Sequence, residues 1–379
     1  MQRTGIYIHI PFCRRRCSYC DFATHSYDTE MAARYVRAII TEIENFNAPT
    51  LLAHEVDTIY FGGGTPSLLA PAQVSSIFDA VQKRFQVATN SEITMEIDPG
   101  TATLDDLREF RRTGINRASF GAQTFDDNEL RRLGRAHTSA DVRRTMTDLR
   151  DAGFDNVSLD LIAGLPSQTL FAWQRNVHQA LALRPEHLSL YLLEIHEGTP
   201  LHAQIKRGTA APPDDDTAAE MYRLMVEESL DAGYEHYEIS NFCLPGHASR
   251  HNTKYWTGAP VYGFGCSAHS YDGISRRWSN DRGTARYLEL IEATGEAVDE
   301  VIELNEQERH AEAIFLGLRL LRGVDLLEHQ TRYGVNVCED YRDALARLAE
   351  AGLIELNGGT MKLTPHGALL SNEVFEIFI

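Results

Sequence analysis

Long apolar runs are missing from this sequence. No stretch reaches the roughly 18 consecutive apolar residues that a membrane-spanning helix needs. The first residues, Met1-Gln2-Arg3-Thr4, lead directly into an apolar, β-branched segment, so we expect no signal peptide. The sequence therefore predicts a protein without a membrane span that acts in the cytoplasm.

Disulfide-forming cysteines and basic side chains are also scarce. Of the six cysteines, three fall between residues 13 and 20, whereas Cys243, Cys266 and Cys338 are scattered, which is unlike the framework of a disulfide-stapled secreted domain. The chain has 36 basic and 54 acidic side chains and a formal net charge of −18, which repels nucleic-acid backbones. This composition favours metal chemistry in a reducing compartment and argues against a nucleic-acid partner.

The first half of the chain alternates short β-branched or apolar runs with longer segments of helical periodicity, the pattern of repeated βα units. Strands joined through helices run parallel, and their carboxyl ends form the usual site of an α/β fold. We therefore predict an α/β partial (βα)6 barrel, too short for eight-stranded closure. The six predicted strands are residues 5–10, 56–61, 92–97, 116–121, 157–162 and 187–193.

The rhythm changes after about residue 200, where an Ala-Pro-rich and acidic stretch marks a looser boundary. The predicted organisation is a barrel domain over residues 1–210, a connecting region over 211–304 and a small α+β domain over 305–379. In the last of these, helical segments precede a strand–turn–strand around Gly358-Gly359. This order predicts a winged-helix-like domain, which the acidic balance assigns to protein contact or packing rather than to DNA.

Three closely spaced thiols follow the first predicted strand. Cys13, Cys17 and Cys20 are separated by three and two residues in a loop that can wrap a metal cluster. Soft thiolates suit iron–sulfur clusters or zinc, and His25 could complete a zinc site. A cubane with four irons and only three protein thiolates leaves one iron open for an external ligand. From the residues alone, both metals stay open.

Glycines and acidic side chains lie near the ends of the following strands. The run Gly62-Gly63-Gly64 is placed where the backbone must approach something closely, although such a run is as often a simple turn. Glu96 ends the third strand, where it could accept hydrogen bonds from hydroxyl groups or simply be a solvated strand end.

The thiol spacing, its place after the first strand of a βα series, and Tyr19 before the third cysteine resemble the radical S-adenosylmethionine (SAM) superfamily. This resemblance implies a [4Fe-4S] cluster on Cys13, Cys17 and Cys20, whose open iron binds the amino and carboxylate groups of SAM. It implies that Tyr19 packs against adenine. It also implies that an electron from the reduced cluster can cleave SAM to a 5′-deoxyadenosyl radical.

Residues 60–67, 119–125, 133–137 and 158–166 resemble one branch of this superfamily, which contains oxygen-independent coproporphyrinogen III oxidase and the heme chaperone HemW. The resemblance covers nearly the whole chain. By matching positions it implies a set of SAM contacts: Tyr7, Gly63, Gly64, Thr65, Glu96, Gln123, Arg135 and Asp160.

The string His251-Asn-Thr-Lys-Tyr255-Trp256 matches the HNxxYW motif of the heme-chaperone group. Imidazole is a good axial ligand of heme iron, and the two aromatic rings offer flat surface to a porphyrin. From the residues alone these side chains could equally be core, and other histidines lie nearby in sequence. The predicted heme ligand is His251, with Tyr255 and Trp256 beside it; His236, His247 and His269 are the alternatives.

The resemblance favours a heme chaperone that binds a [4Fe-4S] cluster, SAM and heme and delivers heme to acceptor hemoproteins. An electron donor would reduce the cluster, and the acceptor could be membrane-associated. The alternative is an oxygen-independent coproporphyrinogen III oxidase, whose relatives carry a longer N-terminal extension and a further cysteine where this chain has Phe22. Whether the protein is an enzyme, and its oligomeric state, stay open at this point.

Overall fold

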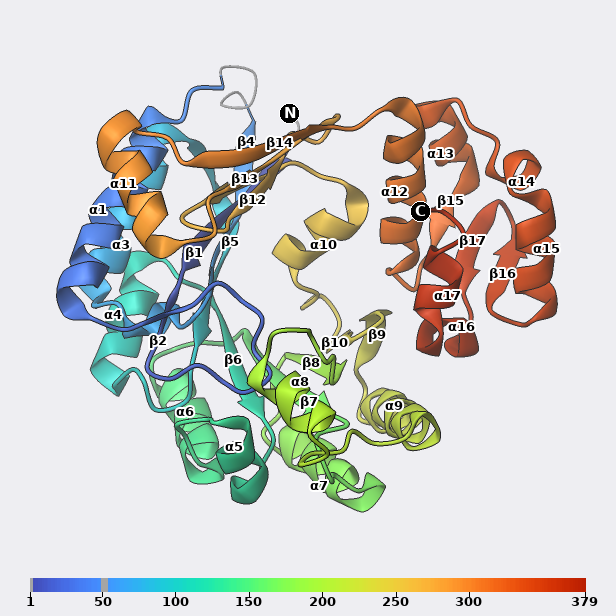
Figure 1. Ribbon diagram of the computed structural model, residues 1–379, viewed down its shortest axis with the longest axis horizontal. Helices are drawn as coiled ribbons and strands as arrows, with labels where there is room; N and C mark the ends of the chain where they lie inside the picture. The colour runs from blue at the N-terminus through green and yellow to red at the C-terminus, as the bar shows by residue number, and fades with distance from the viewer. Residues whose placement is uncertain (1–2, 49–53) are drawn as a thin grey trace.

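A computed structural model describes residues 3–48 and 54–379 of the chain. Its centre is a curved twelve-stranded sheet in the order β14-β13-β12-β11-β1-β4-β5-β6-β7-β8-β10-β9, with helices around the outside and a separate helical module beside it (Figure 1). In the described part of the chain no helix is long and apolar enough to cross a membrane.

All six predicted parallel strands are present, although β5 begins earlier than expected. A seventh parallel strand, β11 (Val261–Phe264), pairs with β1 and was not predicted. The α/β class and the incomplete barrel are thus confirmed, because the sheet curves without closing on itself. The six predicted strands are β1 (Arg3–Ile10), β4 (Glu55–Gly63), β5 (Gln86–Ile97), β6 (Arg117–Gln123), β7 (Val157–Ala163) and β8 (His187–Leu192).

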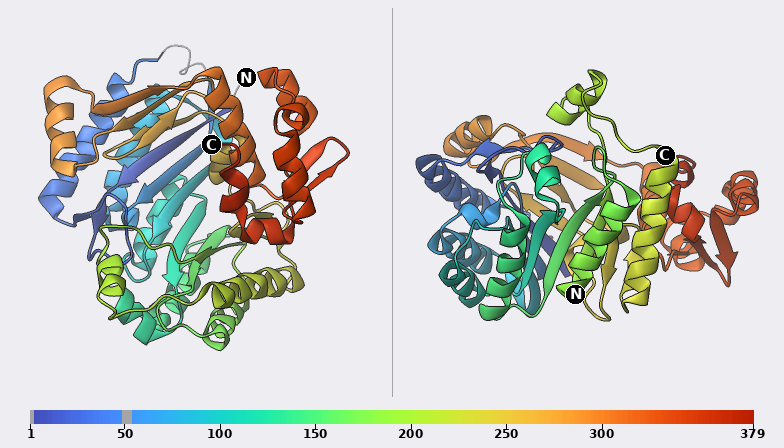
Figure 2. Two further views of the ribbon diagram at one scale, coloured as in Figure 1. Left: turned by 45° about the vertical axis from the view of Figure 1, so that its right-hand side comes forward. Right: turned by 90° about the horizontal axis from the view of Figure 1, so that it is seen from below.

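Helices cover the convex face of this sheet (Figure 2). Several begin at a polar N-cap that accepts a backbone N–H; Asp28, for example, accepts from Met31 N at the start of α1. These helices bury the apolar side of each strand, which in β1 consists of Ile6, Ile8 and Ile10, all 0% exposed. The covering helices are α1 (Thr29–Asn45), α3 (Pro71–Arg84), α4 (Leu104–Thr113), α6 (Ser139–Asp151) and α7 (Leu170–Ala182).

Because side chains alternate along a strand, the opposite positions face the concave side. Inward-facing residues of neighbouring strands lie side by side and form polar rows across the sheet. One such row runs through Tyr7, Tyr60, Thr94 and Arg117. The interior of a small closed barrel is normally packed with branched apolar side chains. A polar concave face therefore indicates a ligand site rather than a core.

Residues 211–304 extend the same sheet with antiparallel strands at both edges. β9 (Glu235–Glu238) and β10 (Asn241–Cys243) continue from β8. β12 (His269–Tyr271), β13 (Arg276–Asn280) and β14 (Val298–Glu303) continue from β11. None of these strands was predicted, and the boundary expected at residue 210 stays a prediction. Three helices belong to this region: α9 (Asp215–Asp231), α10 (Arg250–Thr257) and α11 (Thr284–Thr294). Two shorter helices precede it, α5 (Asp127–Leu133) after β6 and α8 (Pro200–Lys206) after β8.

In the C-terminal module, helices precede a strand–turn–strand, as predicted for a winged-helix-like domain. It adds one strand, β15, that the sequence did not reveal, in a three-stranded sheet of order β15-β17-β16. Its elements are α12 (Glu306–Leu318), β15 (Val324–Asp325), α13 (Leu326–Tyr333), α14 (Val337–Asp340), α15 (Arg342–Glu350), β16 (Ile354–Asn357), β17 (Thr360–Leu363), α16 (Pro365–Leu369) and α17 (Ser371–Phe375).

Candidate cluster, cofactor and heme site

The thiol loop runs from the carboxyl end of β1 toward α1. A short parallel pair, β2 (Phe12–Cys13) with β3 (His25–Ser26), closes the base of the loop. All three thiols are free and half-buried. Cys13 Sγ accepts a hydrogen bond from Thr65 Oγ1 at 3.8 Å, and Cys17 Sγ accepts one from the Arg135 guanidinium at 3.5 Å. Such donors stabilise thiolate, the form that binds metal.

The zinc alternative receives no support from His25. This side chain is exposed, and its Nδ1 lies 2.8 Å from the Ser26 carbonyl oxygen. Across residues 3–48 and 54–379, no three His, Cys, Asp or Glu side chains converge closely enough to hold a single metal ion. A cubane spreads its three thiolates around a cluster instead of converging them on one ion, so the loop fits a cluster.

The glycine run at the end of β4 packs directly against the thiol loop. Gly64 N donates to Ile10 O at 2.8 Å and Thr65 N donates to Phe12 O at 2.7 Å. A Cβ added at Gly64 would lie 2.7 Å from the backbone oxygen of Phe12, and Gly63 has φ +109°, which favours glycine. Close backbone approach thus explains Gly64 and the positive φ explains Gly63, and both lie beside the cluster loop.

Glu96 lies at the centre of the concave face. Its carboxylate accepts from Tyr60 OH at 2.9 Å and from Gly63 N at 3.0 Å, which holds the glycine run in place. Burial raises the pKa of Glu96 to about 7. Tyr7 stacks on Tyr60 and donates to His9 Nδ1 at 3.2 Å, since His9 Nε2 donates to the Ala23 carbonyl.

Arg135 connects the thiol loop with the ends of β5 and β6. Its side chain is buried, pairs with Asp98, and donates to Gly121 O at 2.9 Å as well as to Cys17. Gln123 has φ +64°, and a Cβ on Gly121 would collide with its amide. The ion-pair partner of Arg135 among the described residues is thus Asp98 and not Asp160.

On the concave face, the buried Arg117 and the half-buried Asp160 each have a buried polar atom without a hydrogen-bond partner in the part of the chain that the structure describes. Asp160 Oδ1 and Arg117 Nε have no partner among the described residues. Burial raises the pKa of Asp160 to about 6. Buried unpaired polar atoms are costly, and a polar ligand with hydroxyl and amino groups would satisfy them. The concave face therefore fits SAM.

Tyr19 packs against a small apolar cluster of Leu133, Ile162 and Leu165. Its hydroxyl titrates above its ordinary range, because burial raises the pKa of Tyr19. The flat ring and its apolar neighbours offer a surface on which an adenine base could stack.

His251 is buried at 1% exposure on α10, under the same face. Its Nδ1 lies 3.0 Å from Thr58 Oγ1 and its Nε2 lies 3.1 Å from Tyr255 OH, so both ring nitrogens are occupied. Burial lowers the pKa of His251 to about 3, which keeps the ring neutral. On the same helix, Trp256 forms a cation–π contact with Arg319, whose guanidinium carbon lies 4.2 Å from the centroid of the Trp256 ring.

The sequence reasoning missed four residues of this site: His9, Tyr60, Asp98 and Arg117. Each occupies, or directly follows, an inward position of a parallel strand. The clearest sequence signal was that of Arg117, a charged residue directly before an apolar strand segment. The sequence does not show which face of the sheet its side chain occupies, because that depends on pairing with strands far away in the chain.

These features define the class: a partial α/β barrel with a three-thiol loop, that is, a radical SAM protein. Residues 7–177 match the family model of the Radical SAM superfamily, and residues 304–370 match the HemN C-terminal domain. The chain belongs to this superfamily and, within it, to the family of the heme chaperone HemW.

The family assignment rests on relatives that match over nearly the whole chain, such as the two HemW proteins, and a mitochondrial relative matches over a part of it. The heme chaperone HemW of Bacillus subtilis is 36% identical, with 98% of each chain covered. HemW of Escherichia coli is 32% identical, covering 99% of this chain and 98% of the relative. The mouse mitochondrial Radical S-adenosyl methionine domain-containing protein 1 is 39% identical, covering 70% of this chain and 60% of its own.

Among solved structures, coproporphyrinogen III oxidase (HemN) from Escherichia coli superimposes with a TM-score of 0.86. The match covers 100% of this chain and 90% of that one, at 24% sequence identity. It establishes the shared fold, including the C-terminal module.

Proposed function

We propose that this protein is a heme chaperone, which binds a [4Fe-4S] cluster and SAM on its concave face and carries heme to acceptor hemoproteins. The observation that supports this most is that the proposed cluster and SAM surface lies next to the helix that contains the heme-chaperone motif. The thiol loop and polar concave face adjoin α10, whose HNxxYW side chains reach from the interior to solvent.

Cys13, Cys17 and Cys20 would hold the cluster, which when bound and reduced supplies an electron to SAM. Arg135 and Thr65 donate to the sulfurs and offset their negative charge. The remaining residues would hold SAM through backbone approach, ribose contacts and adenine packing, and the proposed set is Tyr7, Tyr19, Gly63, Gly64, Thr65, Glu96, Gln123, Arg135 and Asp160.

The surroundings of the protein follow from its composition. The unpaired cysteines favour a cytoplasmic location, and the net charge of −18 argues against nucleic acid as a partner. A cellular reductant would supply the cluster electron. A membrane-associated acceptor hemoprotein is compatible with this proposal, because the chaperone only has to contact the acceptor at the membrane surface.

The alternative, coproporphyrinogen III oxidase, is less favoured. The sequence has Phe22, 67% exposed, where oxidase relatives carry a further cysteine. Anaerobic protein loaded with cluster and SAM, given coproporphyrinogen III and dithionite, should form no vinyl product.

The chaperone function is tested by titrating the cluster-loaded protein anaerobically with hemin and then adding apomyoglobin as a general acceptor. We expect saturation near one heme per chain, followed by transfer of the Soret band to myoglobin. A linear, unsaturable titration would refute the proposal, and so would rapid vinyl formation in the oxidase assay.

A further inference from the structure

A cavity of about 440 Å³ opens between α10, strands β11 to β14 and the first helix of the C-terminal module, α12. Its size lies within the roughly 300–1,000 Å³ of small-molecule and cofactor pockets, and it sits where two parts of the fold meet. The apolar part of its wall includes Tyr255, Trp256, Val261, Tyr271, Ile302 and Leu316.

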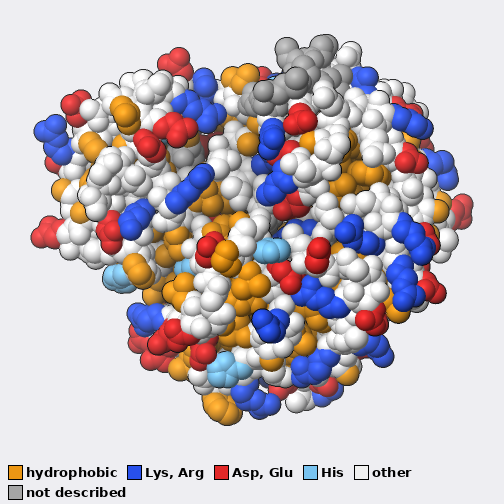
Figure 3. All heavy atoms as spheres, turned by 180° about the vertical axis from the view of Figure 1, so that it is seen from behind, with side chains coloured by type: hydrophobic (Ala, Val, Ile, Leu, Met, Phe, Trp, Pro, Cys, Tyr) orange, Lys and Arg blue, Asp and Glu red, His pale blue; other side chains and the backbone are white. Residues whose placement is uncertain are grey.

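Large apolar side chains around this cavity are left open to solvent. Tyr255 is 38% exposed and Ile302 is 44% exposed. In the space-filling view from behind, hydrophobic side chains gather toward the middle of the molecule, with charged side chains around them (Figure 3). An apolar, aromatic-lined cavity of this kind suits a flat, largely apolar ligand.

The same cavity is lined by two residues that carry unpaired donors. Trp256 Nε1 and Arg277 Nε are buried and have no acceptor within the described residues. A buried donor without a partner is costly, so each calls for an acceptor from elsewhere. Arg277 pairs through its outer nitrogen with Glu312, and Glu300 also lines the cavity, so the site is not simply basic. The donors fit one or two ligand carboxylates.

His269 is the one histidine of the cavity lining. It lies on β12, is exposed, and no hydrogen bond to its ring is found in the part of the chain that the structure describes. His251, by contrast, would have to break its contact with Tyr255 to free Nε2. Neutral imidazole with a free nitrogen is a good ligand of heme iron.

We propose that heme binds in this cavity with His269 as its axial ligand, its porphyrin against Tyr255 and Trp256, and a propionate that accepts a hydrogen bond from Arg277. This inference rests on the proposed chaperone function and deepens it. Binding forms one bond, from an imidazole lone pair to the iron, and displaces a solvent ligand; no electron is transferred. The open side of the cavity leaves heme accessible to an acceptor.

The cavity adjoins the SAM site on the same concave face. Tyr255 contacts His251, whose ring stacks on Tyr60 with centroids 5.1 Å apart, and Tyr60 stacks on Tyr7 at 6.1 Å. A continuous series of rings thus joins the proposed heme cavity to Glu96, through the Tyr60 hydroxyl. Heme and SAM would be neighbours joined by this series of rings.

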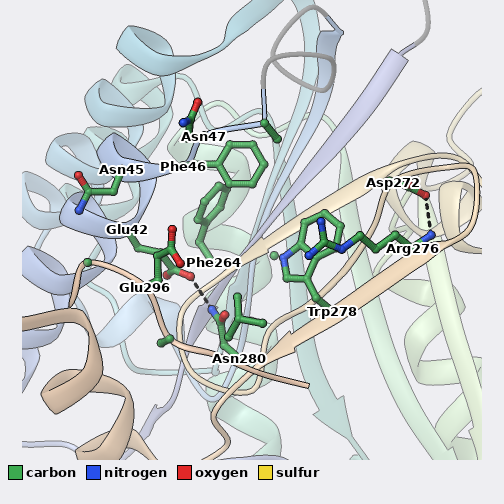
Figure 4. A pocket seen from close by; sticks show the side chains of 15 residues that line it. Glu42, Asn45, Phe46, Asn47, Phe264, Asp272, Arg276, Trp278, Asn280 and Glu296 are labelled. Carbon is green, nitrogen blue, oxygen red and sulfur yellow. Dashed lines mark hydrogen bonds between the residues drawn. The ribbon is translucent and has the colours of Figure 1, made fainter. Parts of the chain in front are cut away.

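A second cavity, of about 420 Å³, is less suited to heme (Figure 4). It lies on the other side of β13 and is lined by acidic Glu42, Asp272 and Glu296. Asn280 donates to Glu42 there, and the lining includes no histidine or cysteine. Carboxylates would repel heme propionates, and no side chain offers a strong iron ligand.

The experiment is an anaerobic hemin titration of the cluster-loaded, full-length protein, read by Soret absorbance and by electron paramagnetic resonance of the ferric heme. His269→Ala should weaken binding about tenfold or more and remove the histidine-ligated signal. Added imidazole should restore that signal in His269→Ala. His251→Ala should keep it. Iron-free protoporphyrin IX should bind wild type and His269→Ala equally, and Arg277→Gln more weakly.

Circular dichroism and cluster absorbance verify folding, and His269→Gln replaces the alanine variant if that one unfolds. If wild type binds hemin saturably while His269→Ala and His269→Gln keep the affinity and the signal, the inference is overturned and the chaperone function stands. Loss of the histidine signal in His251→Ala alone would also overturn it, in favour of His251. Absence of saturable binding to wild type would overturn both.

Discussion

Arg319 joins the C-terminal module to the sheet, and its removal should loosen α12. Its Nε and Nη2 donate to Glu238 Oε1 at 3.1 and 2.8 Å, and Glu238 is 0% exposed at the edge strand β9. The other carboxylate oxygen accepts from Ser240 N and Asn241. The same guanidinium lies on the ring of Trp256, which lines the proposed heme cavity.

Arg319→Met would leave the Glu238 carboxylate buried without its cation. Breaking a buried pair in this way costs roughly 3–5 kcal/mol. Two hydrogen-bond donors to Glu238 remain in the variant, so the cost should lie near the lower end of that range. Loss of the cation–π contact with Trp256 adds about 0.5–1 kcal/mol. We therefore expect the free energy of opening α12 to fall by about 3–4 kcal/mol, which corresponds to amide exchange faster on the order of 100-fold or more.

Hydrogen–deuterium exchange of the cluster-loaded protein, read by mass spectrometry over α12, measures this change. Arg322→Met is the control, because Arg322 is exposed and forms no ion pair in the described part of the chain. Adding Glu238→Gln to Arg319→Met should recover at least half of the loss, since no buried charge then remains. A change under about threefold in Arg319→Met, or no recovery in the double variant, would refute the reasoning.

Three further predictions concern the cluster, the glycine run and a buried acid. Cys17→Ala should lose the brown cluster chromophore while keeping its helical circular dichroism; full retention of iron and sulfide would refute the ligand assignment. Gly64→Ala should impair cluster assembly and SAM binding, because the added Cβ would lie 2.7 Å from the backbone of Phe12. The control is Gly283→Ala, at a position with φ −83°, which should behave as wild type in iron analysis and SAM titration. Burial raises the pKa of Glu42 to about 7, above its ordinary value of 4.5, so its contribution to stability is full below pH 4.5 and is lost as pH rises through 7, by up to about 3 kcal/mol. Urea unfolding of Glu42→Gln against wild type should show this dependence only in wild type, and equal pH profiles would count against it.

The strand positions of the barrel could be predicted because their signal is local. Each βα unit shows a short apolar run between helical segments, and several of the helices begin at a polar cap such as Asp28 or Thr103. The thiol loop was equally readable, since its spacing lies within eight residues of sequence. The family of the chain followed from these local patterns.

The edge strands could not be predicted in this way. β11 spans only Val261–Phe264 and includes a glycine, so its run is too short for the alternation to stand out. It is a strand because it pairs with β1, more than 250 positions earlier in the chain. The strands from β12 to β14 depend in turn on β11. Without them, the cavity beside Trp256 cannot be seen.

The sequence by itself determined the βα series, the cluster thiols and the presence of His251, Tyr255 and Trp256, because composition and spacing along the chain carry those signals. Only the tertiary structure decided which of these side chains face each other. Burial of His251 between Thr58 and Tyr255, and exposure of His269 in an aromatic cavity, both follow from pairing between strands far apart in sequence. A histidine has the same chemistry wherever it occurs in a motif, but its free nitrogen is set by the neighbours that folding brings to it.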